Sequence, residues 1–247
     1  MPLVLITGAS RGIGAATALL AAERGYDVCV NYRSNQEAAN AVVGSITALG
    51  RRALAVQADV AIEADVVRLF ETCDAKLGRL DALVNNAGIL ETQTRVESMD
   101  ASRLQRVFAA NVTGAFICAR EAVKRMSTKH GGKGGAIVNV SSMAAKLGGA
   151  GDYVDYAASK GAIDSFTVGL AKEVGAEGIR VNAVRPGVIR TEIHATSGDP
   201  GRVERIAAAT PLQRGGDAEE VARAILWLAS AEASYITGAL LDVSGGR

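Results

Sequence analysis

The segment YVDYAASK, residues 153 to 160, holds tyrosines and a lysine whose spacing suits proton transfer. On a helix, Tyr156 and Lys160 would lie about 6 Å apart along the axis, whereas Tyr153 and Lys160 would be about 10.5 Å apart. Lowering a tyrosine pKa by about three units takes roughly 4 kcal/mol, and a cation about 4 Å away supplies that order of energy at an effective dielectric constant of about 20. We therefore predict an acid–base pair of Tyr156 and Lys160, while Tyr153 packs or lines a wall. The alternative is an ordinary amphipathic tyrosine beside a snorkelling lysine.

Two further polar features could belong to the same site. Asn111 falls in the middle of the apolar stripe of a predicted helix, and a buried asparagine needs hydrogen-bond partners. The apolar run AIVNVSS ends with Ser141 and Ser142, and open α/β sheets bind ligands at the carboxyl ends of their strands. The alternatives are a structural amide for Asn111 and a capping role for the serines.

A glycine-rich turn, TGASRGIG, joins the first predicted strand to the first predicted helix. Gly8, Gly12 and Gly14 would allow a tight turn, and the helix N-terminus that follows presents N–H groups and a positive dipole end to a pyrophosphate. The spacing GxxxGxG differs from the GxGxxG of larger dehydrogenases. The alternative is an ordinary strand-to-helix turn. The position of the glycine motif in the first βα unit favours dinucleotide binding.

The end of the second predicted strand, VNYRS, indicates which dinucleotide is bound. A carboxylate there would bind the ribose 2′-OH of NAD, whereas a cation would accept the 2′-phosphate of NADP. Asn31 and Tyr32 occupy the place of the acid, and Arg33 and Arg11 supply cations, which favours NADP. Arg33 could instead be an ordinary surface residue. Asp27 lies at the opposite end of the strand and is expected to be solvated.

Strand-like and helix-like segments alternate along the chain. This alternation predicts right-handed crossovers, and hence an α/β fold with a doubly wound, mainly parallel sheet of about seven strands and helices on both faces. No linker-like run divides the chain, so residues 1–247 form one predicted domain. The strand candidates are residues 3–7, 27–32, 52–57, 80–86, 135–142, 179–184 and 238–243, and the helix candidates are 15–24, 37–49, 63–77, 102–126, 156–174 and 218–228.

Composition argues against several other classes of function. A net charge of +1 and 4% aromatic residues give no basic or stacking surface for nucleic acid. The three cysteines form no CxxC pair, which suits a reducing, cytoplasmic compartment, and the two histidines form no metal motif. The first apolar run is broken at Gly8, well short of the roughly 20 residues of a membrane span. We therefore expect a cytoplasmic protein with no metal, nucleic-acid or membrane partner.

Six motifs in order resemble the short-chain dehydrogenase/reductase family in its single-domain form. They are TGASRGIG, NNAG at residues 85–88, Asn111, the serine pair, YAASK, and RPGVIRTE at residues 185–192. The chain is similar to 3-oxoacyl-acyl-carrier-protein reductase-like and glucose 1-dehydrogenase-like NADP-dependent members over essentially its whole length. The resemblance implies a Rossmann-type fold, a cofactor that is preferably NADP(H) with NAD(H) possible, and hydride transfer between nicotinamide and a carbonyl or secondary alcohol.

The resemblance also implies residue roles. Tyr156 would be the acid/base, Lys160 would lower its pKa and hold the nicotinamide ribose, Ser142 would orient the substrate oxygen, and Asn111 would hold a water in a proton relay. The gap from Ser142 to Tyr156 is one residue longer than usual in the family, so Ser141 remains the alternative. From the glycine-rich turn, the end of the second predicted strand and the resemblance, we assign the following residues to the cofactor site: Gly8, Ser10, Arg11, Gly12, Ile13, Gly14, Asn31, Tyr32, Arg33, Ser34, Asp59, Val60, Asn86, Ala87, Gly88, Tyr156, Lys160, Pro186, Gly187, Val188, Ile189 and Thr191.

The substrate is less well defined by the sequence. Residues 190–214 resemble the variable substrate loop of the family and carry Glu192, His194, Arg202 and Arg205. Acyl-carrier reductases often have a basic residue where this chain has Glu177, which disfavours a carrier-protein substrate. A catalytically silent nucleotide-sensing or scaffold protein on the same fold is the alternative function.

An assembly is also expected, because single-domain members of the family usually form homotetramers. The predicted helices 102–126 and 156–174 have more apolar and small positions than one sheet-facing stripe needs, notably in GAFICA and SFTVGL. The C-terminal stretch YITGALLDVSGG offers a second candidate surface. The alternative is that these residues line only the seam between helices and sheet.

Overall fold

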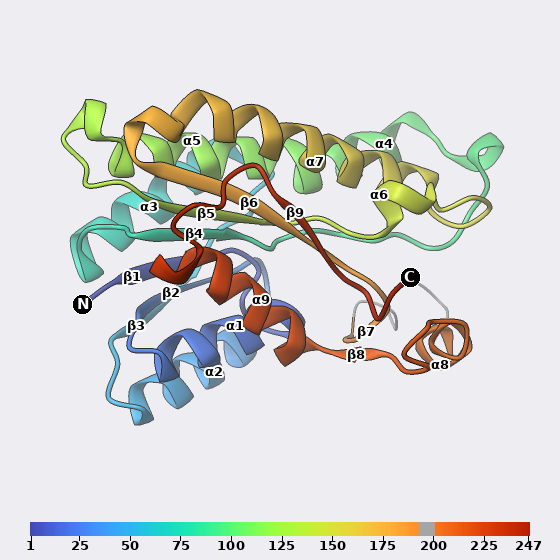
Figure 1. Cartoon of the computed structure of the whole chain (residues 1–247), viewed down its shortest axis with the longest axis horizontal. Coiled ribbons are helices and arrows are strands. Elements are labelled where there is room, and N and C mark those ends of the chain that lie inside the picture. The colour runs from blue at the N-terminus through green and yellow to red at the C-terminus, as the bar shows by residue number, and fades with distance from the viewer. Residues whose placement is uncertain (193–200) are drawn as a thin grey trace.

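The computed structural model describes residues 1–192 and 201–247, and parallel strands form its centre (Figure 1). Seven strands make one sheet in the order β3-β2-β1-β4-β5-β6-β9, and every pairing in it is parallel. The predicted strand count and sheet type are therefore confirmed. The strands are β1 (Leu3–Ile6), β2 (Asp27–Tyr32), β3 (Ala53–Gln57), β4 (Ala82–Asn85), β5 (Gly135–Val140), β6 (Ile179–Pro186) and β9 (Leu240–Val243).

Helices cover both faces of the sheet, as predicted for a doubly wound fold (Figure 1). Crossovers put them there because each connects two parallel strands. One layer holds α1 (Gly12–Glu23), α2 (Gln36–Ala48) and α9 (Ala218–Ala229). The other holds α3 (Glu63–Leu77), α4 (Ala101–Phe108), α5 (Gly114–Met126) and α7 (Val154–Val174).

Short elements complete the chain near the carboxyl ends of the strands. The helix α6 (Ala144–Leu147) precedes α7, and β7 (Ile189–Arg190) pairs in parallel with β8 (Gly216–Asp217). The helix α8 (Arg202–Ala207) lies between these two strands in sequence. Part of the predicted substrate loop, including His194, lies outside the described residues.

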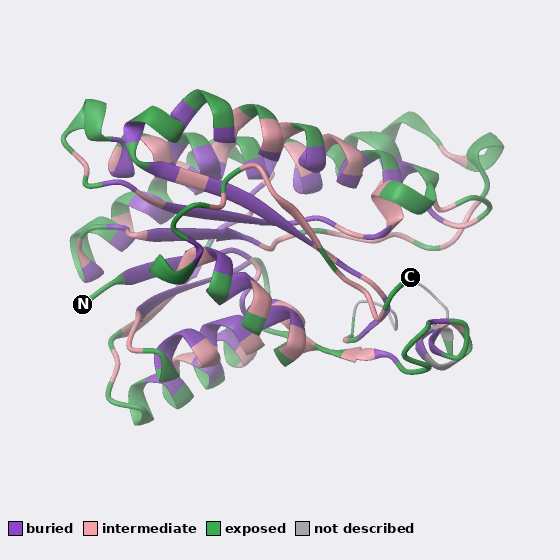
Figure 2. Cartoon of the chain, viewed as in Figure 1, coloured by how far each residue is buried: buried purple, intermediate pink, exposed green. Residues whose placement is uncertain are grey.

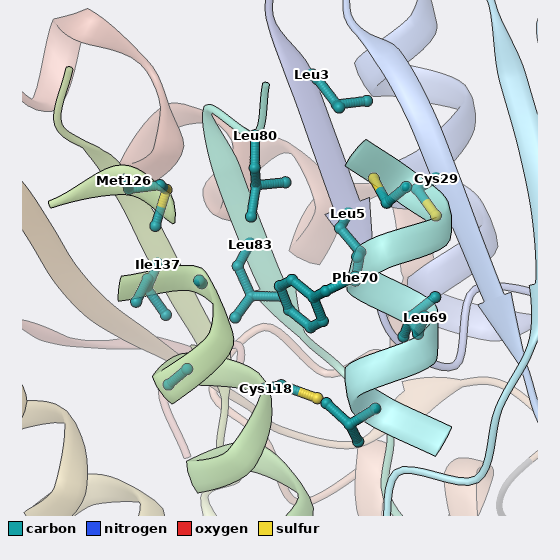
Figure 3. Packing of buried hydrophobic residues seen from close by; sticks show 14 of the residues in the cluster. Leu3, Leu5, Cys29, Leu69, Phe70, Leu80, Leu83, Cys118, Met126 and Ile137 are labelled. Atoms are coloured by element: carbon teal, nitrogen blue, oxygen red, sulfur yellow. The ribbon is translucent and has the colours of Figure 1, made fainter. Parts of the chain in front are cut away.

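Each face of the sheet has its own apolar core, because the buried strands present alternate side chains to opposite sides. Figure 2 shows the central strands buried and the outer helix surfaces exposed. On the α3 and α5 side, Phe70 and Leu69 pack against Leu5 and Leu83 (Figure 3). On the α1, α2 and α9 side, the core contains Val30, Ile46 and Ile225 among its buried residues.

The strand order reverses between β1 and β4, the point at which such sheets leave a crevice at their carboxyl edge. From β1 the chain moves outward to β2 and β3, then returns to pair β4 with the other side of β1. The ends of β1 and β4 therefore diverge into loops on opposite faces. This crevice is where the predicted glycine turn and the NNAG motif meet.

The predicted helix over residues 102–126 is continuous in direction but contains one wider turn. Residues Ala109–Thr113 form a π-helical turn between α4 and α5, and Asn111 lies within it. A π-turn inserts one extra residue into the helix, and such insertions are often found at functional sites. Helical periodicity in the sequence could not reveal it, because the apolar stripe continues on both sides.

The expectation that Asp27 is solvated was wrong. Its side chain is 1% exposed and accepts hydrogen bonds from Arg51 at 2.9 Å and from Arg52 Nε at 2.8 Å. The backbone N–H of Arg52 donates to the same carboxylate at 3.0 Å. Asp27 therefore ties the start of β2 to the segment that leads into β3.

Candidate active site

A pocket at the carboxyl edge of the sheet brings together most of the residues that the sequence indicated. Its walls come from the β1–α1 turn, the ends of β2, β4, β5 and β6, and the first turns of α7. Gly14, Tyr32 and Asn111 do not line it. The predicted residues that do are Gly8, Ser10, Arg11, Gly12, Ile13, Asn31, Arg33, Ser34, Asp59, Val60, Asn86, Ala87, Gly88, Ser142, Tyr156, Lys160, Pro186, Gly187, Val188, Ile189 and Thr191.

The glycine turn has a backbone that side chains would not allow. Gly8 and Gly12 have φ values of +62° and +55°, in the left-handed region that favours glycine. A Cβ on Gly14 would lie 2.5 Å from the carbonyl oxygen of Gly8 and 2.6 Å from Asn86 Nδ2, so Gly14 allows close packing behind the turn. Asn86 Nδ2 donates to the carbonyl oxygens of Thr7 at 2.8 Å and Gly8 at 3.0 Å. These hydrogen bonds fix the backbone of the turn, and Gly8 and Gly12 form part of the pocket wall.

The end of β2 sends alternate side chains to opposite faces, which separates Tyr32 from its neighbours. Tyr32 is 5% exposed and packs in the core beside α1 and α2. Asn31 and Arg33 lie on the pocket side. Asn31 Oδ1 accepts from the Gly8 N–H at 3.1 Å, and its Nδ2 donates to the carbonyl oxygen of Ala58 at 3.0 Å. Asn31 therefore joins the glycine turn to the chain beyond β3.

Arg11 and Arg33 both line the pocket. Arg33 is exposed, and its carbonyl oxygen accepts from Gln57 Nε2 at 3.0 Å, which fixes the backbone after β2. The side chain of Arg11 is 59% exposed and lies 3.5 Å from the Glu192 carboxylate. An exposed pair of this length contributes little to stability, so Arg11 can exchange this partner for an anion.

Tyr156 and Lys160 lie in the first turns of α7, which begins at Val154, two residues before the predicted helix of residues 156–174. The Lys160 ammonium is buried, donates to the carbonyl oxygen of Val140 at 2.7 Å, and lies 5.6 Å from the centroid of the Tyr156 ring. Tyr153 is 3% exposed and forms part of the pocket wall. Of the two tyrosines, Tyr156 is the one stacked under the lysine.

Burial shifts the pKa values of this pair in opposite directions. It raises the pKa of Tyr156 to about 12, although a hydrogen bond with the Ser142 side chain acts the other way. It lowers the pKa of Lys160 to about 8, although the charge of Asp164 acts the other way. At Tyr156 desolvation outweighs the Ser142 hydrogen bond, and the Lys160 ammonium is directed at the Val140 carbonyl oxygen.

The serine pair divides its hydrogen bonds between the helix and the pocket. Ser141 is 2% exposed, and its hydroxyl donates to the carbonyl oxygen of Lys160 at 3.2 Å. Ser142 Oγ accepts from the Ala144 N–H at 3.1 Å and is hydrogen-bonded to Tyr156. Ser141 thus anchors α7 to the end of β5, whereas Ser142 lies beside the phenol.

Asn111 lies behind the pocket wall and supports it. Its Oδ1 accepts from the Ile89 N–H at 2.7 Å, and its Nδ2 donates to the Ile89 carbonyl oxygen at 3.0 Å and to Ser159 Oγ at 3.1 Å. A Cβ on Gly88 would lie 3.2 Å from Asn111 Oδ1 and 3.6 Å from Lys160 Nζ. The π-turn therefore places an amide between the loop after β4 and the start of α7.

The sequence analysis did not identify a buried ion pair that fixes the start of α7. Arg103 on α4 is buried, and its Nε donates to the Asp155 carboxylate at 2.7 Å while Nη1 donates to the Thr92 carbonyl oxygen at 2.7 Å. It thereby connects α4, the loop after β4 and the residue before Tyr156. The only sequence signal was an arginine at a position one turn from apolar neighbours, which is common on exposed helix faces.

Other wall residues were also missed. Ile89, Leu90 and Met143 closely follow predicted motifs, so proximity in sequence could have indicated them. Ile206 lies within the predicted substrate loop, although it was not named as a site residue, whereas Leu147 and Arg247 have no local sequence signal. Of the charged residues expected in the substrate loop, Glu192 lines the pocket and Arg205 is exposed outside it.

The fold and this site define a dinucleotide-binding oxidoreductase, and comparisons with known proteins agree. A family model described as Enoyl-(Acyl carrier protein) reductase matches residues 8–247. The chain is 59% identical to the uncharacterized oxidoreductase YgfF of Escherichia coli K12 over the full length of both, and 43% identical to a Synechocystis 3-oxoacyl-[acyl-carrier-protein] reductase over 99% and 96% of the two chains. A solved Burkholderia cenocepacia short-chain dehydrogenase in complex with NADP is 33% identical, with a TM-score of 0.91 over 99% of this chain and 97% of that one.

The chain belongs to the short-chain dehydrogenase/reductase family. It is an enzyme that uses a nicotinamide cofactor and acts on carbonyl or alcohol groups of small molecules. Within the described ranges, no helix has the length and apolar character that crossing a bilayer requires. Among the same residues, no group of three or more His, Cys, Asp or Glu side chains is arranged to hold a metal ion.

Proposed function

We propose that this protein is an NADP(H)-dependent oxidoreductase that transfers a hydride between the nicotinamide and a carbonyl or secondary alcohol, with Tyr156 as the acid/base. The observation that carries the proposal is the convergence of Ser142, Tyr156 and Lys160 on the pocket that also contains the glycine turn. Their contacts join β5 and α7 at the carboxyl edge of the sheet.

The side chains divide the work of proton transfer between them. Tyr156 gives its phenolic proton to the substrate oxygen during reduction and takes it back during oxidation. Ser142 hydrogen-bonds the same substrate oxygen and the phenol, which orients the oxygen for the transfer. When bound, the nicotinamide supplies or accepts the hydride and, when oxidised, carries a positive charge. Lys160 holds its own positive charge 5.6 Å from the centroid of the Tyr156 ring, and this charge favours the phenolate.

Asn111 and Asp155 act in this proposal by holding other groups. Asn111 fixes the carbonyl and N–H of Ile89 behind Gly88, and we assign to it the water that connects Lys160 to a proton relay. Asp155 is held by Arg103, so the first turn of α7 has little freedom to move Tyr156. Apolar residues such as Leu90, Met143 and Leu147 line the wall beside Tyr156 and limit the access of water to the reacting atoms.

The glycine turn fits a dinucleotide pyrophosphate, because glycines at positions 8, 12 and 14 leave room where a Cβ would fill it. We assign the adenosine end to the side where Asn31, Arg33, Ser34, Asp59 and Val60 line the pocket. No carboxylate lies in the place of the 2′-OH acceptor at the end of β2, and Arg33 and Arg11 supply positive charge there. These features support NADP(H) over NAD(H).

Replacing Tyr156 by phenylalanine tests the catalytic part of the proposal. Tyr156→Phe removes the transferable proton, so turnover should fall by about 100-fold or more while NADPH affinity is retained. Tyr153→Phe is the matched comparison, since it removes a hydroxyl from the same wall, and it should cost less than about 10-fold. A panel of carbonyl and alcohol substrates followed by cofactor absorbance measures both. Unchanged turnover in Tyr156→Phe would remove the phenol from the mechanism.

Arg33→Ala tests the cofactor preference. Without this guanidinium, NADPH should bind roughly 10-fold more weakly or worse, because a charge-assisted hydrogen bond to the 2′-phosphate is lost, and NADH should be little affected. Arg79→Ala removes the same charge from the opposite edge of the sheet and should change neither constant. Fluorescence titrations with both cofactors measure the ratio, and equal weakening for NADPH and NADH would contradict the assignment.

Membership of this enzyme family argues against the alternative from the sequence, a catalytically silent sensor on the same fold. It would bind NADPH with the same residues but reduce nothing in the substrate panel, in wild type as in Tyr156→Phe. The acid–base pair is complete here, which favours an enzyme.

Glu177, which disfavoured a carrier-protein substrate, is 7% exposed and pairs with Lys129 at 2.7 Å, so little of its charge faces a docking partner. Including an acyl-carrier-protein thioester in the substrate panel shows whether the enzyme accepts a carrier-protein substrate.

A further inference from the structure

A chain of alternating charges runs beneath the site, from α7 to α6. Its members are Asp164 on α7, Arg185 on β6, Asp242 on β9 and Lys146 on α6, which we call the charge network. Both Nε and Nη2 of Arg185 contact Asp164 Oδ2, at 2.9 Å and 2.8 Å, and Nη1 lies 3.5 Å from Asp242 Oδ1. Lys146 Nζ donates to Asp242 Oδ2 at 2.6 Å. The network thus joins four elements, and three of them, α7, β6 and α6, also carry residues that line the pocket.

Asp164 is the innermost member of the charge network and lies one turn after Lys160 on α7, about 6 Å along the axis. It is 8% exposed. Arg185 occupies its Oδ2, whereas Oδ1 accepts no hydrogen bond from any of the residues described. One carboxylate oxygen is therefore left with its charge only partly compensated in a region of low dielectric constant, where charges act strongly on their neighbours.

Asp164 is the charged group, among the residues described, whose charge favours the protonated form of Lys160. From β5, the Val140 carbonyl oxygen accepts a hydrogen bond from the Lys160 ammonium and also favours it, and from the π-turn the neutral amide of Asn111 lies beside Gly88. The helix α7 contributes the Tyr156 phenol and Asp164, and β6 contributes Arg185, which is paired with Asp164. Burial lowers the pKa of Lys160 to about 8, and the charge of Asp164 opposes that shift.

We propose that Asp164 is a positioning residue that keeps Lys160 protonated in the working enzyme, and that Arg185 holds Asp164 in place for this purpose. The inference rests on the proposed function, because it concerns the lysine that supports the acid/base. Arg185 directly precedes Pro186, and Lys146 directly precedes Leu147, both in the pocket wall. The charge network therefore also fixes these two walls relative to α7.

The test follows the titration of Lys160 itself in the full chain without cofactor, by NMR of protein labelled with ¹³C at lysine Cε. The Lys160→Arg variant identifies the resonance. In Asp164→Asn the midpoint should move to lower pH by on the order of one unit, because removing a nearby negative charge favours the neutral amine. Asp164→Glu keeps the negative charge, so its Lys160 midpoint should lie close to that of the wild type. Asp155→Asn also removes a buried, arginine-paired carboxylate from α7 and should leave the Lys160 midpoint unchanged.

An unchanged Lys160 midpoint in folded Asp164→Asn overturns the inference. If that variant does not fold, Asp164→Asn/Arg185→Gln removes both members of the pair, so no buried guanidinium is left alone. The midpoint should still fall, since Asp164 and not Arg185 dominates the charge felt by Lys160. A midpoint that stays or rises in this double variant overturns the inference equally.

Turnover separates this inference from the proposed function. With an accepted substrate, the alkaline limb of the pH–rate profile in Asp164→Asn should move to lower pH, in the same direction as the NMR midpoint. A loss of packing alone would lower the rate at all pH values without moving the limb. If the NMR midpoint shifts while wild type reduces no substrate, the role of Asp164 stands and the proposed function fails.

Discussion

At the scale of single residues, burial favours the neutral forms of both Tyr156 and Lys160. The anionic form of a phenol and the cationic form of an amine both lose hydration in the pocket, which raises one pKa to about 12 and lowers the other to about 8. In the proposed mechanism, Tyr156 therefore holds a proton that it can donate to the substrate oxygen, and a further positive charge near the phenol would favour the phenolate.

Asp27 gives a prediction that is independent of catalysis. Burial alone would raise the pKa of Asp27, but hydrogen bonds from Arg52 and Arg51 hold it below its ordinary value of 3.8. Because the folded pKa is depressed, the stabilisation is present above about pH 4 and is lost as the pH falls through the folded pKa. Asp27→Asn should lower the free energy of unfolding by about 3 to 5 kcal/mol at pH 7. Urea denaturation at a series of pH values below about 4 should show this difference shrinking progressively, and a difference independent of pH would contradict the assignment.

At the scale of elements, the start of α5 is pressed against the loop that carries Asp59 and Val60. A Cβ on Gly114 would lie 2.8 Å from the carbonyl oxygen of Val60. The π-turn before Gly114 sets this approach, since it directs Asn111 toward the pocket and α5 toward the loop. The adenosine side of the pocket and the amide behind Lys160 are thus positioned by one helix junction.

Two glycine-to-alanine changes test this junction. Gly114→Ala should lower the free energy of unfolding by about 1 to 3 kcal/mol, because the methyl group must displace backbone. Gly44→Ala, inside α2, meets nothing within 4 Å and should raise stability by about 0.5 to 1 kcal/mol through helix propensity. Thermal denaturation of both variants gives the comparison. Equal effects of the same sign would show that the junction tolerates the added methyl.

At the scale of the whole molecule, apolar side chains remain exposed on the outer surface of the helix layer above the site. Phe116 on α5 is 46% exposed and its ring stacks on Phe166 of α7, with centroids 3.7 Å apart. Phe108 on α4 and Val154 at the start of α7 are also more than a third exposed, at 37% and 38%. Large apolar side chains exposed on one helix layer are typical of a protein interface, so the homotetramer expected from the sequence remains our prediction.

Light scattering at micromolar concentration should report about four times the 25.4 kDa chain mass. Phe116→Glu should shift the population to smaller species, because a carboxylate would be buried without a partner in the interface. Leu49→Glu changes a similarly exposed residue, 49% accessible at the end of α2, and should leave the mass unchanged. A fully active wild-type monomer would show that the Phe116 and Phe166 surface is not an interface.

The order of strands and helices and the edge of the sheet that holds the site were predictable from the sequence, because both depend on local patterns. Apolar runs, helical periodicity and glycine turns act over a few residues, and parallel crossovers then bring all strand ends to one edge. The spacing of Tyr156 and Lys160 belongs to the same class, since one helix determines it. Ser142 as the neighbour of Tyr156 was preferred from motif position alone.

Only the tertiary structure decided the properties that depend on contacts between distant residues. The pleat and burial of β2 directed Tyr32 into the core and Arg33 to the pocket, although they are adjacent in sequence. Asp27 became a buried ion-pair member because Arg52, 25 residues later along the chain and just before β3, lies beside it. The pKa values of Tyr156 and Lys160, and the contact of Asp164 with Arg185, likewise depend on how α7 packs against β5 and β6. Desolvation and charge act through space, so a linear pattern determines which groups are present, and packing determines their charge.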